Sequence, residues 1–309
     1  MKEEIFKQKY LKGIKSVLDF ALKNPYSDFY RKKYEGLGLS PESINSFKDF
    51  QKIPTLTKEE ISAVGVGRRI FVPKNQVLMY VLASEAVNSQ EKTIIPQSAF
   101  VSEYGINEEE LAGMGVTKLL MLLSPISTVK QRTLANYKKQ IALIMTEFKD
   151  MPLTAEIVVQ LNSQGILTTP TALCSLIKQL EGSNFDTAAI KWISLVEEYC
   201  SPEKLNFLKS VFTNARFNSR YLTTEVGDTI GYKCSHLESS FYEYHLLAHN
   251  NLLEIANDGE MIYTDLHQPK AFPLIRYRTM DIGWLKEQRC KCGQDSLLVH
   301  KGRKTPNNV

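Results

Sequence analysis

The sequence predicts an α/β protein that combines a parallel sheet, covered by helices on both faces, with a β-rich part after residue 230. Between residues 118 and 212, short apolar segments of strand type alternate with helical segments, which is the pattern of a parallel sheet. Residues 261–266 (MIYTDL) also have the composition of a strand. We therefore expect a helical segment at 1–75, α/β layers at 76–230 and a β-rich part at 231–309.

The individual elements are predicted from local periodicity and from helix-start signals. Apolar residues recur with a helical period over 3–22, and 24–61 contains short capped helices, with Pro41 after Ser40 and a capping-box spacing from Thr57 to Glu60. Pro170 and Pro202 stand at or near helix starts. The expected strands are 77–83, 118–123, 166–168, 190–196 and 261–266, followed by a bend at Pro269 and Pro273 and a second strand in the rest of 272–283. The expected later helices are 131–148, 154–163, 170–180 and 202–212.

Length and composition exclude several classes of protein. A chain of 309 residues with 43% hydrophobic and 23% charged residues is ordinary for a globular protein of one large domain or two. A net charge of +4 gives no case for a nucleic-acid partner, and no apolar run approaches the roughly 18 residues that span a membrane. Five cysteines without a framework spacing predict a reduced, cytoplasmic protein.

The stretch 272–283 (FPLIRYRTMDIG) places Asp281 among apolar residues. A carboxylate in such a position needs a partner, which can be an arginine, backbone amides or the hydroxyls of a ligand. The stretch resembles the ribose-binding strand of adenylate-forming enzymes, and PLIRYRT resembles the phenylacetate–coenzyme A ligase branch. That resemblance implies that Asp281 accepts hydrogen bonds from the ribose of ATP or AMP. The alternative is that Asp281 pairs with Arg276 or Arg278 across a turn.

Residues 218–230 (NSRYLTTEVGDTI) resemble a second motif of the same enzymes. The resemblance implies that Tyr221 stacks on adenine, Thr224 touches phosphate and Glu225 helps to hold Mg²⁺. An aromatic face suits a purine, and a carboxylate at the carboxyl end of a strand is placed for a hard cation. The alternative is a packed aromatic residue and an acid at a helix start. Leu222 and Met280 stand where the family has glycine.

The loop 84–95 (SEAVNSQEKTII) stands where the family has a glycine-rich loop that wraps the triphosphate. Ser84 and Lys92 match the two ends of that loop, so the resemblance assigns them to the phosphates. However, the sequence has no glycine from residue 84 to residue 104, and Glu85 and Glu91 would repel phosphate. The sequence therefore predicts weak binding of ATP.

Two cysteine-containing segments predict a structural zinc site. Cys234-Ser235-His236 precedes Cys290-Lys291-Cys292-Gly293, and thiolates with one histidine are the ligand set of a closed tetrahedral zinc site. Several members of the family resemble this arrangement. We expect Cys234, His236, Cys290 and Cys292 to bind the metal, the alternative being reduced surface cysteines beside an unrelated histidine. The remaining histidines, His245, His249, His267 and His300, are expected to be solvated.

The last residues resemble the hinge of the family, whose arginine, here Arg303, approaches the ribose. A small lysine-bearing C-terminal domain follows in relatives, and we expect it to be absent here. The resemblance implies an AMP-forming ligase that joins a small-molecule carboxylate to a thiol acceptor, impaired in the isolated chain. The alternative is a non-catalytic binding or scaffold protein, or a partial enzyme completed by a separate polypeptide. The altered glycine positions favour these alternatives.

Overall fold

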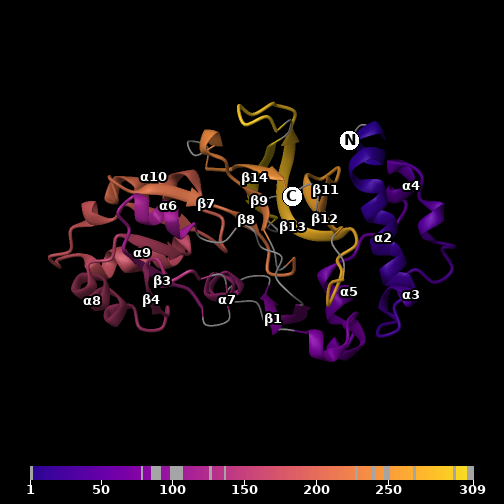
Figure 1. Cartoon of the computed structure of the whole chain (residues 1–309), viewed down its shortest axis with the longest axis horizontal. Coiled ribbons are helices and arrows are strands. Elements are labelled where there is room, and N and C mark those ends of the chain that lie inside the picture. The colour runs from indigo at the N-terminus through magenta and orange to yellow at the C-terminus, as the bar shows by residue number, and fades with distance from the viewer. Residues whose placement is uncertain are drawn as a thin grey trace.

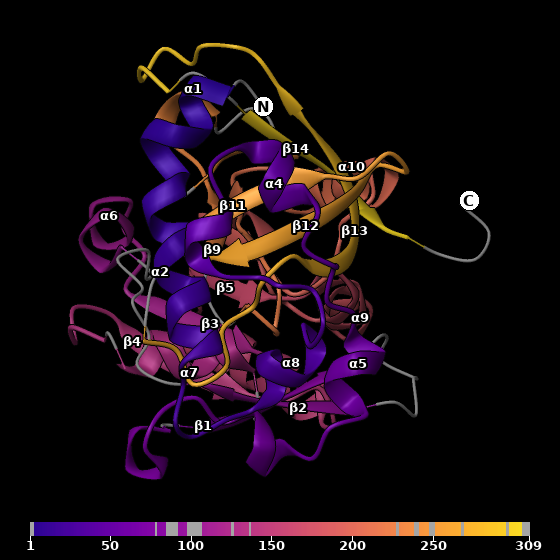
Figure 2. The same cartoon turned by 90° about the vertical axis from the view of Figure 1, so that its right-hand side faces the viewer.

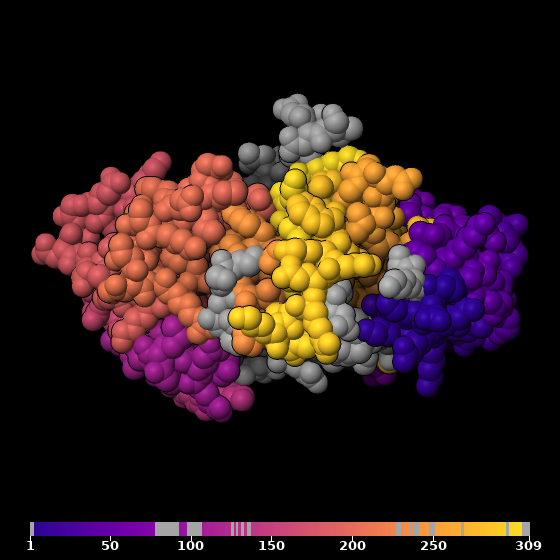
Figure 3. Space-filling model, turned by 90° about the horizontal axis from the view of Figure 1, so that it is seen from above, coloured from indigo at the N-terminus to yellow at the C-terminus, as the bar shows by residue number. Residues whose placement is uncertain are grey.

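The computed structural model describes residues 3–77, 79–84, 92–97, 107–124, 127–135, 137–226, 229–237, 241–246, 251–266, 269–294 and 297–304. The N-terminal helices lie at one end of the long axis, an antiparallel sheet occupies the middle, and a parallel sheet with its helices forms the other end (Figure 1). The view from above shows the C-terminal segment, in yellow, at the surface between these two ends (Figure 3). The predicted α/β class is confirmed.

The helices and strands have the following bounds. The α-helices are α1 Glu3–Ile5, α2 Leu11–Leu22, α3 Phe29–Lys33, α4 Phe47–Gln51, α5 Lys58–Ser62, α6 Glu108–Gly113, α7 Thr128–Ala135, α8 Met151–Leu161, α9 Pro170–Leu180 and α10 Pro202–Val211, and Phe6–Tyr10 is a π-helical turn between α1 and α2. The strands are β1 Met79–Ser84, β2 Lys92–Gln97, β3 Lys118–Leu122, β4 Ala142–Thr146, β5 Gly165–Thr168, β6 Trp192–Leu195, β7 Arg216–Ser219, β8 Tyr221–Leu222, β9 Thr229–Tyr232, β10 Glu243–Leu246, β11 Asn251–Ile255, β12 Glu260–Asp265, β13 Tyr277–Lys286 and β14 Leu297–Arg303. No helix in these described parts is long and apolar enough to cross a membrane.

The five-stranded sheet is parallel throughout, in the order β4-β3-β5-β6-β7. Successive side chains of a strand point to opposite faces. Leu120 and Leu122 of β3 therefore pack with α8, α9 and α10, while Leu119 and Met121 pack with α6. Both faces of the sheet are thus buried, as the short apolar strands predicted.

The predicted helix over 131–148 is wrong in its second half. Helix α7 ends at Ala135, and the segment ALIMT forms strand β4 at the edge of the parallel sheet. Its residues pair with β3, from Ala142 opposite Lys118 to Thr146 opposite Leu122. Pairing with a neighbouring strand therefore overrides a local pattern that is compatible with a helix.

The seven-stranded sheet has the order β11-β12-β13-β14-β10-β9-β8, and its strands pair antiparallel. The N-terminal helices cover one side of it (Figure 2). Tyr30 of α3 donates a hydrogen bond to the carbonyl of Pro273 at 2.6 Å, and its hydroxyl accepts one from the amide of Ile275 at 3.2 Å. The N-terminal helices and this sheet share one apolar core. Fully burying one large apolar side chain contributes about 1.5–3 kcal/mol, so the core binds the helices firmly to the sheet. Capping-box bonds predicted for Thr57 and Glu60 are present at the start of α5.

The second strand expected after the bend at Pro273 begins at Tyr277 and continues to Lys286. Residues 272–276 approach it as a buried irregular segment, in which Arg276 has a φ of 51°. Within β13, Met280 has a φ of 63°, and the register to β12 shifts between Glu260 and Ile262. Asp281 follows Met280 and lies opposite Arg303 of β14, and the register to β14 shifts between Ile282 and Gly283.

Candidate functional site

The candidate site lies where loops of the parallel sheet meet the antiparallel sheet. Tyr199 and Cys200 follow β6, and the carbonyl of Cys200 accepts a hydrogen bond from the hydroxyl of Tyr242 at 2.8 Å. Ser219, the last residue of β7, donates a hydrogen bond to the carbonyl of Phe241 at 2.9 Å. The carboxyl ends of parallel strands are the usual place for a ligand in an α/β protein. This edge therefore carries the residues to be tested as a site.

Tyr221, Asp281 and Arg303 converge at this junction although they are far apart in the sequence. The hydroxyl of Tyr221 donates a hydrogen bond to Oδ2 of Asp281 at 2.8 Å. Asp281 is the β-sheet partner of Arg303, which is exposed at the end of β14. A carboxylate with one tyrosine donor keeps further acceptor capacity. The cluster can thus offer a carboxylate and a guanidinium to a polar ligand.

The ring of Tyr221 is covered by His300 of β14. Their ring centroids are 4.7 Å apart, with an angle of 33° between the planes. Tyr221 is only 4% exposed, and burial, followed by the charge of Asp281, raises its pKa well above the usual value. His300 therefore covers a face of the ring on which the resemblance places adenine, and the hydroxyl of Tyr221 is bonded to Asp281.

His300 and Gly302 belong to an aromatic cluster that sequence reasoning missed. Tyr199 lies edge-on to His300 at 5.5 Å between ring centroids, and Nε2 of His300 is 4.0 Å from Oδ1 of Asp281. Gly302 has a φ of 110°, and a Cβ there would lie 3.2 Å from the ring of Tyr199. A glycine is therefore required at the predicted hinge. The expectation that His300 is solvated is wrong, because its side chain is 11% exposed.

Glu225 lies behind this cluster and is paired with a lysine. Its carboxylate oxygen Oε1 is 3.4 Å from Nζ of Lys58, and the two side chains are 10% and 4% exposed. Thr224 beside it is half-buried. The cation partner of Glu225 thus comes from the start of α5, which the sequence did not indicate.

The predicted phosphate loop is carried by a hairpin. Strands β1 and β2 pair antiparallel, with Ser84 directly opposite Lys92. The loop that joins them, with Glu85 and Glu91, lies outside the described residues. The structure therefore brings the two matching ends of the loop together at one end of a hairpin.

The cysteines predicted to bind zinc come together, with a different histidine. Cys234, Cys290 and Cys292 form a group with His245, and their ligand atoms lie within 4.8 Å of one another. Nε2 of His245 is 3.2 Å from the Sγ of Cys234 and 3.2 Å from that of Cys292. The Sγ atoms of Cys234 and Cys290 are 3.7 Å apart, so these thiols are not joined by a disulfide. Three cysteines and one histidine fit a structural zinc ion.

His236 is exposed and is not part of this group, contrary to the expectation from its spacing. His245 is completely buried, in strand β10 opposite Tyr232. The signal for it was present in the sequence, because a histidine inside the strand-like run YEYHLL must find a polar partner when it is buried. The predictions that His249 and His267 are solvated fall outside the described residues.

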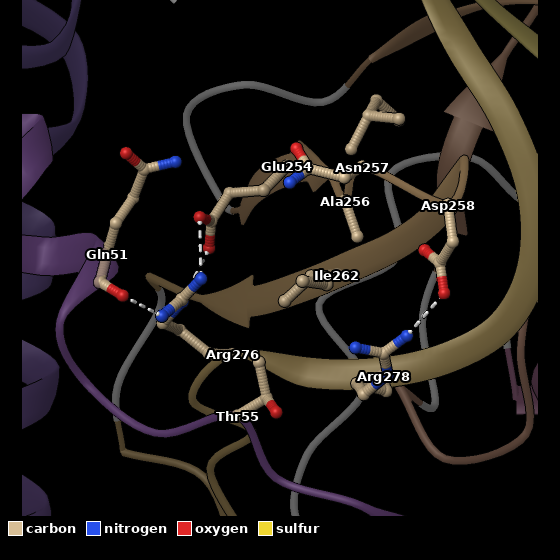
Figure 4. A pocket seen from close by; sticks show the side chains of 10 residues that line it. Gln51, Thr55, Glu254, Ala256, Asn257, Asp258, Ile262, Arg276 and Arg278 are labelled. Atoms are coloured by element: carbon tan, nitrogen blue, oxygen red, sulfur yellow. Dashed lines mark hydrogen bonds and ion pairs between the residues drawn. The ribbon is translucent and has the colours of Figure 1, made fainter.

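The two arginines of PLIRYRT do not pair with Asp281. Arg276 forms two hydrogen bonds with Glu254, at 3.0 and 3.2 Å, and Arg278 pairs with Asp258 and Glu260. Both arginines line a cavity of about 510 Å³ between the α4–α5 connection and the β11–β12 hairpin (Figure 4). These carboxylates balance the charges of Arg276 and Arg278. Neither arginine is therefore the partner of Asp281, which was the alternative proposed from the sequence.

The fold is similar to that of solved AMP-forming ligases. A 2-hydroxyisobutyryl-CoA ligase in the postadenylation state, in complex with 2-HIB-AMP, matches with a TM-score of 0.74 and 15% identity, over 95% of this chain and 66% of the ligase. Its open conformation with 2-HIB-AMP and CoA gives 0.66 and 14%, over 95% and 74%. A long-chain-fatty-acid-CoA ligase from Archaeoglobus fulgidus gives 0.51 and 14%, over 75% and 52%.

The chain therefore has the fold of the N-terminal domain of adenylate-forming enzymes, as predicted. It spans about two thirds of the length of the 2-hydroxyisobutyryl-CoA ligase. At these identities the similarity concerns the fold. No protein-family profile matches the sequence, and no curated protein matches it significantly.

Proposed function

We propose that this chain is the nucleotide-binding part of an AMP-forming carboxylate ligase. In such a reaction a carboxylate oxygen attacks the α-phosphorus of ATP, which releases pyrophosphate and leaves an acyl-adenylate. A thiol then attacks the acyl carbon, which gives a thioester and releases AMP. The observation that carries the proposal is the convergence of Tyr221, Asp281 and Arg303 at the junction of the two sheets, in a fold shared with such ligases.

Each residue of the junction has a role in the proposed site. Asp281 accepts hydrogen bonds from the ribose hydroxyls, and Arg303 approaches the same sugar from the neighbouring strand. Tyr221 keeps the carboxylate of Asp281 in place through its hydroxyl. We assign the contacts with the phosphates to Thr224 and to Ser84 and Lys92, which pair with each other in the β1–β2 hairpin. Catalysis of this kind depends mainly on positioning and on charge stabilisation.

We propose further that the enzyme belongs to the phenylacetate–coenzyme A ligase type, with an aryl or acyl acid and a thiol as substrates. The segment PLIRYRT supports this, as does the cysteine pair that follows the strand of Asp281. A partial enzyme completed by a separate polypeptide is an alternative to a ligase that works alone.

A second candidate is a ligase-fold protein that binds a ligand without catalysis. It is favoured by the covered ring of Tyr221 and by the pairing of Glu225 with Lys58. Both features leave a nucleotide fewer contacts than an open pocket would give it. The two candidates differ in whether the chain activates a carboxylate.

Calorimetry with AMP and ATP tests the binding site. We expect weak binding of AMP, little gain from the additional phosphates, and loss of binding in Asp281→Ala. Asp19→Ala is the matched control, because Asp19 lies on α2 in an exposed pair with Lys23. If ATP binds much more tightly than AMP, the prediction that the loop binds the phosphates weakly is wrong. If Asp281→Ala binds AMP as tightly as wild type, Asp281 does not bind the ribose.

Carboxylate-dependent exchange of pyrophosphate into ATP separates the two candidates. A panel of aryl and fatty acids is tested with the chain alone and with candidate partner domains. Exchange that depends on Asp281, with or without a partner, supports the ligase. If AMP binds through Asp281 but no acid supports exchange under either condition, the non-catalytic candidate is correct.

A further inference from the structure

The ammonium group of Lys58 lies inside the protein. Lys58 is the first residue of α5 and is 3% exposed. Its Nζ makes no hydrogen bond of good geometry with any described residue, and its charge partner is Oε1 of Glu225 at 3.4 Å. A buried ammonium without a carboxylate costs several kilocalories per mole, so this pair is required once the lysine is buried.

Groups from three other elements act on Glu225. Lys58 approaches its carboxylate from α5, and burial, followed by the charge of Glu225, raises the pKa of Tyr277 in β13 well above the usual value. The side-chain amide of Gln97, in β2, donates a hydrogen bond to the backbone carbonyl of Glu225 at 3.3 Å. The pair therefore ties the segment after β8 to the N-terminal helices, to the hairpin and to the central sheet.

A divalent cation does not fit beside this carboxylate. Mg²⁺ requires a near-octahedral shell of oxygen atoms at about 2.0–2.1 Å. Here one side of Glu225 already faces an ammonium group, which supplies only N–H donors and repels a second cation. Among the described residues, the cysteine–histidine group is the one cluster of three or more potential metal ligands, and Glu225 is not part of it.

We propose that Lys58 is the built-in cation of Glu225 and that the chain binds no divalent cation at this carboxylate. Glu225 is then a positioning residue, held by Lys58 and by the bond from Gln97, that fixes the segment carrying Thr224. This inference does not depend on the ligase activity, because it concerns a contact within the chain.

The first test measures binding of Mn²⁺ as a spectroscopic substitute for Mg²⁺, in protein saturated with zinc so that the cysteine group is blocked. Free Mn²⁺ is followed by electron paramagnetic resonance, with and without ATP. Wild type and Glu225→Gln should bind Mn²⁺ equally under both conditions. Weaker Mn²⁺ binding by Glu225→Gln than by wild type would overturn the proposal.

The second test is a double-mutant cycle of thermal unfolding. Lys58→Met and Glu225→Gln each leave one partner unmatched, so both should lower the melting temperature. Lys58→Met/Glu225→Gln should recover most of the loss, because both charges are then removed. Losses that simply add would show that the pair is not coupled and would overturn the proposal. Neither test needs a carboxylate substrate, so failure of the proposed ligase function is seen separately in the exchange assay.

Discussion

At the residue scale, Arg276 connects three segments of the chain. It holds Glu254 of β11 through two hydrogen bonds and donates to the backbone carbonyl of Gln51 (Figure 4). It also donates to the backbone carbonyl of Ile53. Burial raises the pKa of Glu254, and the charge of Arg276 partly offsets this effect. The arginine thereby gives a donor to two carbonyl groups at the end of α4 and just after it.

Replacing Arg276 by Met should lower the free energy of unfolding by about 3–5 kcal/mol, because Glu254 would remain as an uncompensated buried charge. Chemical denaturation measures the loss. Arg68→Met is the matched control, since Arg68 pairs with Asp28 at the surface, where such a pair contributes about 0–1 kcal/mol. Equal losses in the two variants would contradict the importance assigned to the buried pair. Arg276→Met/Glu254→Gln should lose less than the sum of the two single changes.

At the scale of elements, the cysteine–histidine group joins β10 and the segment after β9 to the loop between β13 and β14. Cys290 packs with Leu237 and Leu297 in a small apolar cluster of its own. The turn from Cys290 to Gly293 is closed by the amide of Gly293, which donates to the carbonyl of Cys290 at 2.9 Å, and Gly293 has a φ of 98°. A metal bound there would fix the loop to the sheet.

We predict one zinc ion per chain at this group, and removal by a chelator should lower the melting temperature by roughly 5–10 °C, because metal binding adds directly to folding stability. Metal analysis of His245→Ala should show loss of zinc. His236→Ala is the control at the exposed histidine and should keep the metal. If His245→Ala keeps the zinc and His236→Ala loses it, the histidine ligand is His236, as the spacing in the sequence predicted.

Strand β13 keeps a left-handed backbone at Met280, a position where the family has glycine. The conformation is held by the carboxylate of Glu260, which accepts a hydrogen bond from the amide of Met280 at 3.1 Å, and by the amide of Lys304, which donates to its carbonyl at 2.7 Å. A residue with a Cβ in this region is strained by about 1–2 kcal/mol. The strand thus keeps its shape without the glycine.

Met280→Gly should raise the free energy of unfolding by about 0.5–1 kcal/mol, since relief of strain exceeds the entropy that glycine adds to the unfolded chain. Met145→Gly in the edge strand β4, where the side chain is exposed, should instead lower it by a similar amount. Denaturant melts of both variants decide this. A loss of stability in Met280→Gly as large as that in Met145→Gly would mean that no strain is stored at Met280.

At the scale of the whole molecule, buried tyrosines join the N-terminal helices, the central sheet and the junction with the parallel sheet. Burial raises the pKa of Tyr30, Tyr221 and Tyr277 well above the usual value, and it raises that of Tyr244 to about 12. These groups keep their protons in the folded state at pH values where the unfolded chain loses them. Their contribution to stability is therefore complete below pH 10 and is lost as the pH rises above it.

The free energy of unfolding should fall above pH 10 by about 1.4 kcal/mol per pH unit for each such tyrosine, until the folded state itself titrates. Denaturation between pH 9 and 11.5 measures the slope. Tyr221→Phe should reduce it by the share of one residue, whereas Tyr26→Phe, at a side chain that is 55% exposed, should leave it unchanged. If the slope is identical in wild type and Tyr221→Phe, groups other than Tyr221 cause the loss of stability above pH 10.

Local patterns determined much of the fold, because caps, prolines and apolar periods act over a few residues. The helix α9 from Pro170 to Leu180, with Thr169 as its cap, was predicted with both ends, and the β-rich character after residue 230 was predicted as well. The three cysteines that come together with His245 also followed from the sequence. For helix α9 the signal lies in neighbouring residues, and for the cysteines it lies in the residue type.

Tertiary structure alone decided the partners of the buried charges and the edge of the parallel sheet. The sequence places Lys58 and Glu225 far apart, as it does His245 and Cys290, so no local pattern could pair them. Strand β4 forms because β3 offers it a ladder of backbone hydrogen bonds, and His300 covers Tyr221 because β14 crosses the junction. Burial and pairing depend on which distant segments the fold brings together, and that information is not present in any short stretch of the chain.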